Sequence, residues 1–126
     1  MSLITEADVE KLEKLLRQLH GLHSEISLLA KKSPNDAINA FKLKFINKVI
    51  QAGNEVLGNR YKPFAEFSLF EFDDLPSNSD VTVVLTQYIQ ATRGYKLDNI
   101  VKSGLARWVY KLNGEPSKIE TNRPIL

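Results

Sequence analysis

The chain has 126 residues, a net charge of +2 and no cysteine, which excludes disulfides, thiolate metal sites and a cysteine nucleophile. A single domain of this length buries about two-thirds of the surface that its unfolded chain exposes, so it needs no cross-link for stability. The sequence shows no signal peptide and no apolar run approaching the roughly 18 residues of a membrane span. We therefore expect a soluble, cytoplasmic domain with no membrane partner.

A heptad pattern marks the first predicted helix, over residues 5–32. Numbered from Thr5, its a and d positions hold only leucine and isoleucine from Leu12 to Leu29, and such a stripe packs against neighbouring helices. Thr5 suits the N-cap, and the cations Lys31 and Lys32 suit the C-terminal end. Gly21 falls at an outward position in the middle of this helix.

The second predicted helix covers residues 34–57. Ser33 and Pro34 resemble a helix start, with serine as N-cap and proline at the first helical position. Gly58 is a suitable residue for the end of the helix. Because the break after residue 32 is short, the two helices should form a long antiparallel hairpin.

Residues 59–78 form an aromatic-rich connection that contains four of the six phenylalanines. Their spacing fits both a short helical turn and a strand, so periodicity leaves helical and irregular structure open. The acidic residues are concentrated in the same region, because residues 63–80 carry five acidic side chains and no basic one. We expect this segment to pack on the domain or on a partner.

A shorter second hairpin is predicted from residues 79–93 and 98–113. Ser77 or Ser79 caps the first of its helices, and Asn113-Gly114 ends the second. The predicted fold is therefore an all-α, four-helix antiparallel bundle. Residues 1–114 make a single domain, and residues 115–126 are expected to be a flexible tail because they show no periodicity.

The predicted helix lengths differ between the two hairpins. The first pair should extend for about 36–39 Å and the second for about 22 Å, which leaves some 15 Å of the long hairpin without cover. We therefore predict a non-catalytic protein–protein interaction domain that self-associates as a homodimer or docks on a partner through this hairpin. Aromatic side chains dominate interface energetics, which makes Phe67, Phe70 and Trp108 the candidate anchors.

Nucleic-acid binding is an alternative function, because basic side chains gather on the predicted helix faces. If they face the same way, they form a footprint for phosphate groups. No recognised DNA- or RNA-binding pattern accompanies them. The residues are Lys31, Lys32, Lys42, Lys44, Lys48, Lys102, Arg107 and Lys111.

Catalysis is a second alternative. The spacing of Arg17 and His23 resembles the R-x(4–6)-H motif of HEPN domains, which are small helical bundles. The resemblance implies a ribonuclease in which His23 acts as acid or base and Arg17 contacts the phosphate. It covers two residues, lies in the first rather than a late helix, and has Gln18 where the family usually carries a small polar residue. His20 and His23 could share a metal, but the sequence offers no third histidine or cysteine, so we expect neither metal nor cofactor.

Overall fold

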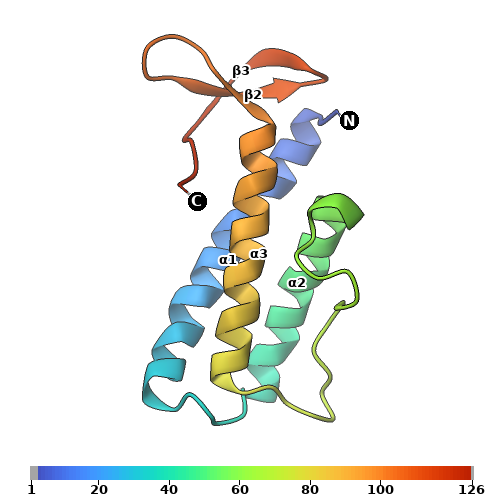
Figure 1. The fold of residues 1–126 in the computed structure, drawn as a ribbon, viewed down its shortest axis with the longest axis vertical. Helices are drawn as coiled ribbons and strands as arrows, with labels where there is room; N and C mark the ends of the chain where they lie inside the picture. The colour runs from blue at the N-terminus through green and yellow to red at the C-terminus, as the bar shows by residue number, and fades with distance from the viewer. Residues whose placement is uncertain (1–2, 126) are drawn as a thin grey trace.

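The computed structural model describes residues 3–125 and consists of three long helices followed by a three-stranded antiparallel sheet (Figure 1). The sheet lies across one end of the helices, opposite the loop that joins the first two (Figure 1). The predicted all-α four-helix bundle is therefore wrong. None of the helices in the described part of the chain is long and apolar enough to cross a membrane. The elements are α1 (Glu6–Lys32), α2 (Ala40–Tyr61), α3 (Asn78–Asp98), β1 (Ile100–Lys102), β2 (Trp108–Leu112) and β3 (Glu115–Thr121).

Helix α1 agrees with its prediction. The Thr5 side chain accepts a hydrogen bond from the backbone N–H of Asp8, and the Asp8 carboxylate accepts one from the backbone N–H of Thr5. This reciprocal capping box satisfies two N–H groups that the helix itself cannot. The heptad stripe is buried, with Leu12, Leu19 and Ile26 at 1% exposure or less.

Helix α2 begins later than predicted. Ser33 caps the end of α1 instead, its N–H bonding the carbonyl of Leu29 at 2.8 Å, and the N-cap of α2 is Asn39. The loop between them bonds the start of α3, where the N–H of Asn78 meets the carbonyl of Asp36 at 2.9 Å. These long-range bonds satisfy backbone groups that a helix from residue 34 would have paired locally.

Helix α2 also extends beyond Gly58, where the prediction ended it. Gly58 has φ of 64° and produces a kink, a conformation that glycine adopts without steric cost. In the turn after the kink, the Tyr61 hydroxyl donates a hydrogen bond of 2.5 Å to Asp98, and the Tyr61 ring packs edge-on against Tyr95 with centroids 4.9 Å apart. The last turn of α2 thereby contacts the end of α3.

The N-cap of helix α3 is Ser77, one of the two predicted alternatives, and its side chain accepts a hydrogen bond from the N–H of Asp80. The helix continues to Asp98, five residues past the predicted end. Its 21 residues span about 31 Å, and it packs against both α1 and α2. The predicted length mismatch, with some 15 Å of uncovered hairpin, is therefore wrong.

The sheet occupies the region predicted as the fourth helix and the flexible tail. Its order is β1-β2-β3, and Asn113 and Gly114 form the turn between β2 and β3 with φ of 52° and 83°. Two consecutive residues with positive φ are typical of the tight hairpin turn whose twist matches the flanking strands. Residues 98–113 are therefore not a helix, and residues 115–121 belong to the folded structure.

A polar cluster around Glu13 joins the sheet to the helices. Its carboxylate oxygen Oε1 accepts hydrogen bonds from Lys96 of α3 and Thr121 of β3, both at 3.1 Å, and from the hydroxyl of Tyr110 of β2. Burial, the largest influence, raises the pKa of Glu13, but the hydrogen bonds from Tyr110 and Lys96 and the charge of Lys96 outweigh it, so the pKa is lowered overall. The pKa of Tyr110 is raised by burial and by its bond to Glu13. Glu13 is thus held ionised and Tyr110 protonated at neutral pH.

Candidate interaction surface

The aromatic connection between α2 and α3 covers the core with one side. The rings of Phe64, Phe67 and Phe70 pack edge-to-face in sequence, with centroids 6.1 and 5.0 Å apart, and Phe64 contacts Tyr88 of α3 at 6.5 Å. All three rings are half-buried against the core. Two predicted partner anchors, Phe67 and Phe70, therefore contribute to packing within the chain.

Two asparagines of α2 hold the backbone of this connection in place. The Asn47 amide donates to the carbonyl of Phe70 and accepts from its N–H, both at 3.0 Å, and the Asn54 amide donates to the carbonyl of Ser68 at 3.1 Å. Sequence reasoning missed both residues. The available signal was Asn47 itself, a polar side chain between Ile46 and Val49 on the apolar stripe of the helix, since a buried amide needs hydrogen-bond partners.

The other side of the connection and the first turns of α2 expose large apolar side chains. Phe41 is 70% exposed, Phe45 43%, Leu69 39% and Phe72 53%. The Phe41 and Phe45 rings pack edge-on with centroids 5.0 Å apart. Leu69 and Phe72 flank Phe70, whose backbone is bonded to Asn47 of α2. We call these four residues, an exposed pair on α2 and an exposed pair on the connection, the aromatic surface.

Charges of both signs border the aromatic surface. The Lys48 ammonium lies 6.0 Å from the centre of the Phe45 ring. Across residues 3–125 the ion pairs join Lys42 to Glu25, Lys96 to Glu13 and Arg107 to Glu120. The exposed charges beside the aromatic surface are therefore uncompensated within the chain. They are Lys44 and Lys48 on α2, and Glu71, Asp73 and Asp74 on the connection.

The basic residues of the nucleic-acid alternative do not lie together. Lys31, Lys32, Lys42, Lys44 and Lys48 lie at the end of α1 and the start of α2, whereas Lys102, Arg107 and Lys111 lie in and beside the sheet at the opposite end (Figure 1). The structure thus separates them into two groups.

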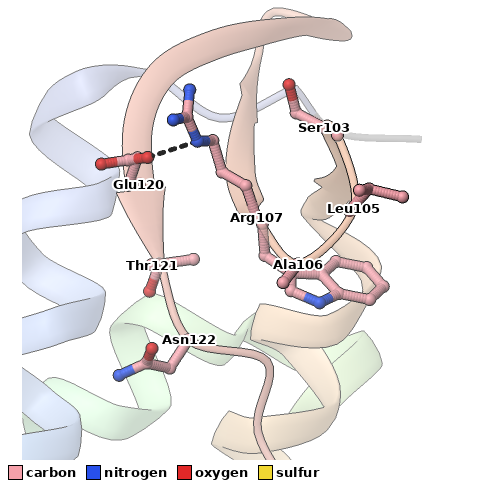
Figure 2. A pocket seen from close by; sticks show the side chains of 9 residues that line it. Ser103, Leu105, Ala106, Arg107, Glu120, Thr121 and Asn122 are labelled. Carbon is pink, nitrogen blue, oxygen red and sulfur yellow. Dashed lines mark ion pairs between the residues drawn. The ribbon is translucent and has the colours of Figure 1, made fainter.

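The third predicted anchor, Trp108, lies beside an open pocket of about 860 Å³ between the β1–β2 loop and the end of β3. Figure 2 shows the Arg107 side chain reaching Glu120 across this pocket, with Nε and Oε1 2.6 Å apart. Trp108 is half-buried, and the Arg123 guanidinium lies 5.5 Å from the centre of its ring. At the tip of the loop, Leu105 is 98% exposed. The charge of Arg107 is therefore already paired.

The two residues of the ribonuclease alternative point in different directions. Six positions along a helix turn a side chain by about 120°. His23 accordingly lies against α3, its Nε2 3.1 Å from the Thr86 hydroxyl, while Arg17 is exposed beside His20. Within the described chain no three histidine, aspartate or glutamate residues are grouped so that they could hold a metal ion.

Comparisons of the chain with protein-family models, with curated proteins and with solved structures found no match. The geometry of residues 3–125 is therefore the basis for assigning a function. Of the sites predicted from sequence, the neighbourhood of the aromatic connection has the largest group of exposed apolar side chains.

Proposed function

We propose that this chain is a non-catalytic interaction domain that self-associates through its aromatic surface. The observation that carries the proposal is the exposure of Phe41, at 70%, in edge-on contact with Phe45. Grouped phenylalanines in water lose the favourable free energy of burial, and contiguous exposed apolar patches commonly mark binding sites. Their fixed mutual packing reduces the side-chain ordering that association would cost.

The distribution of charge favours a second copy as the partner. A two-fold interface uses the same patch on both subunits, so the patch must be complementary to itself. The aromatic surface is bordered by Lys44 and Lys48 on α2 and by a separate acidic group, Glu71, Asp73 and Asp74, on the connection. In a two-fold contact, the lysines of one copy face Asp73 and Asp74 of the other.

The available area is consistent with a reversible dimer. Fully buried aromatic side chains remove roughly 150–250 Å² each, so the exposed parts of Phe41, Phe45 and Phe72 supply on the order of 300 Å². A standard interface buries about 800 Å² per partner. The phenylalanines would form its centre, and the charged residues its rim.

Sedimentation velocity over the micromolar range tests the proposal. We expect a concentration-dependent monomer–dimer equilibrium that the double variant Phe41→Ser, Phe45→Ser shifts to monomer. The matched control is Leu105→Ser, which removes a more exposed apolar side chain from the β1–β2 loop and should leave the equilibrium unchanged. A strict monomer, or a dimer that persists in the double variant, overturns self-association through this surface.

A charge exchange tests the two-fold arrangement. The variants Lys44→Glu, Lys48→Glu and Asp73→Lys, Asp74→Lys should each be monomeric, because like charges then face one another across the interface. An equimolar mixture of the two should form a heterodimer, since both rim contacts then join opposite charges, one with the native signs and one with the signs reversed. If the mixture remains monomeric, the proposed pairing of rims is wrong.

A further inference from the structure

A second feature of the structure is a cleft between α1, α3 and the chain that follows β3. Figure 1 shows this last segment leaving the sheet and running back beside the helices. The cleft has a volume of about 550 Å³, within the usual range for small-ligand sites. The ionisable side chains in its lining are Glu13, Arg17, His20, Arg93, Lys96 and Arg123.

The cleft has an excess of positive charge. Arg17, Arg93 and Arg123 make none of the ion pairs found in the described residues. Glu13 is the one acidic residue in the lining, and its charge is compensated by Lys96. Within residues 3–125, three arginines from separate segments therefore line the cleft without forming an ion pair.

Two of the three arginines, Arg93 and Arg123, have contacts that restrict their side chains. An Arg93 guanidinium nitrogen, Nη2, lies 3.5 Å from His20 Nε2, and Arg123 lies over the Trp108 ring. Arginine presents a planar set of N–H donors that matches two oxygens of a phosphate group, and such charge-assisted bonds are stronger than neutral ones. Binding of an anion would neutralise the three charges together.

His20 should respond to such an anion. Burial, the positive charge of Arg93 and the nearby His23 lower its pKa, so its imidazole is neutral at neutral pH. The charged groups near it are Glu13 and Arg17 on α1, Arg93 and Lys96 on α3, and Arg123 after β3. An anion between the arginines would reverse the unfavourable field and raise the pKa of His20.

We infer that this cleft binds the phosphate groups of a small phosphate ester, with Arg17, Arg93 and Arg123 as the phosphate-binding residues. The site is separate from the aromatic surface, which lies on α2 and the aromatic connection, and does not depend on self-association.

Isothermal titration calorimetry with pyrophosphate, ADP and sulfate tests the inference. Pyrophosphate and ADP should bind, and Arg17→Gln and Arg93→Gln should each weaken binding by about tenfold, whereas Lys102→Gln, an exposed lysine outside the cleft, should not. Tighter binding of ADP than of pyrophosphate would show that the cleft recognises a nucleotide. Equal affinity for the two would show that it recognises the phosphate groups alone. The inference is overturned if neither pyrophosphate nor ADP binds, or if the arginine variants bind them as tightly as the native protein does. It is also overturned if sulfate binds as tightly as pyrophosphate and ADP.

Proton NMR provides a second readout, because the chain has only two histidines. Pyrophosphate should raise the pKa of His20, and the ring proton shifts of His23, which lies against Thr86, serve as the internal reference. The rise should be smaller in Arg17→Gln, an exposed position where the substitution spares the fold. An unchanged His20 titration at saturating pyrophosphate would place the ligand elsewhere.

Discussion

The ammonium group of Lys96 lies 3.1 Å from the carboxylate of Glu13, although the two residues are 83 positions apart in the chain. Lys96 is only 6% exposed, so its charge depends on this partner. Because the same carboxylate oxygen also accepts hydrogen bonds from Tyr110 and Thr121, one side chain joins two helices to two strands.

Replacing Glu13 should destabilise the protein strongly. Glu13→Ala leaves Lys96 without a partner, and breaking a buried pair costs about 3–5 kcal/mol. Because the Glu13 side chain is 33% exposed, we expect a loss of about 2–3 kcal/mol. Urea unfolding measures the change, with Glu10→Ala, an exposed position on the same helix, as control. Equal stability of the two variants would show that the pair contributes little.

The contribution of Glu13 should depend on pH. Its pKa in the folded protein is lower than the ordinary value of 4.5, so the unfolded chain binds the proton more readily. The resulting stability is present above about pH 4.5 and is lost as the pH falls through the folded pKa. We expect the difference in unfolding free energy between the native chain and Glu13→Gln to narrow from neutral pH to about pH 3. A difference that stays constant would contradict the lowered pKa.

Two glycine substitutions should act in opposite directions. Gly114 has φ of 83°, so Gly114→Ala should cost about 1–2 kcal/mol through backbone strain. Gly21 lies in α1 with no atom within 4 Å of an added Cβ, so Gly21→Ala should stabilise the protein by about 0.5–1 kcal/mol. Thermal unfolding of both variants gives the comparison, and a stabilising Gly114→Ala would rule out the turn as described.

Loss of Asn47 should release the aromatic connection. Asn47→Ala removes both hydrogen bonds to the Phe70 backbone, and we expect a loss of about 2 kcal/mol. Limited proteolysis should then cut within residues 62–77 faster than in Gln51→Ala, an exposed position one turn further along α2. Unchanged cleavage in Asn47→Ala would show that ring packing alone holds the segment.

Features with a local cause could be predicted from sequence. The capping box joins Thr5 and Asp8, three positions apart, and the Ser77 cap likewise bonds Asp80. The heptad stripe also identified the buried face of α1, because helical periodicity places its members on one side. These interactions form within a turn or two, wherever the helix later packs.

Residues 98–113 needed the tertiary structure. Val101, Leu105, Trp108 and Leu112 fit helical spacing, yet Val109 pairs with Val101 on one side and Glu120 on the other. The available signal was Asn113-Gly114, a hairpin dipeptide that we interpreted as a helix end. Helix α2 starts at Ala40 rather than at the predicted residue 34 for a related reason, because Asn78 forms a backbone hydrogen bond with the loop that precedes α2.

The candidate sites, like the fold, depend partly on local sequence and partly on contacts between distant residues. Composition pointed to the aromatic connection, but the bonds of Asn47 decide that Phe67 and Phe70 face the core while Phe72 faces solvent. No spacing in the sequence relates Arg17 to Arg93 and Arg123, which line one cleft only because α3 lies along α1 and the chain after β3 runs back beside them. Local hydrogen bonds and periodicity thus determined where α1 lies and where α3 begins. Contacts between distant residues decided the sheet, the orientation of the aromatic rings and the charge of the cleft, because their partners are set by packing rather than by sequence spacing.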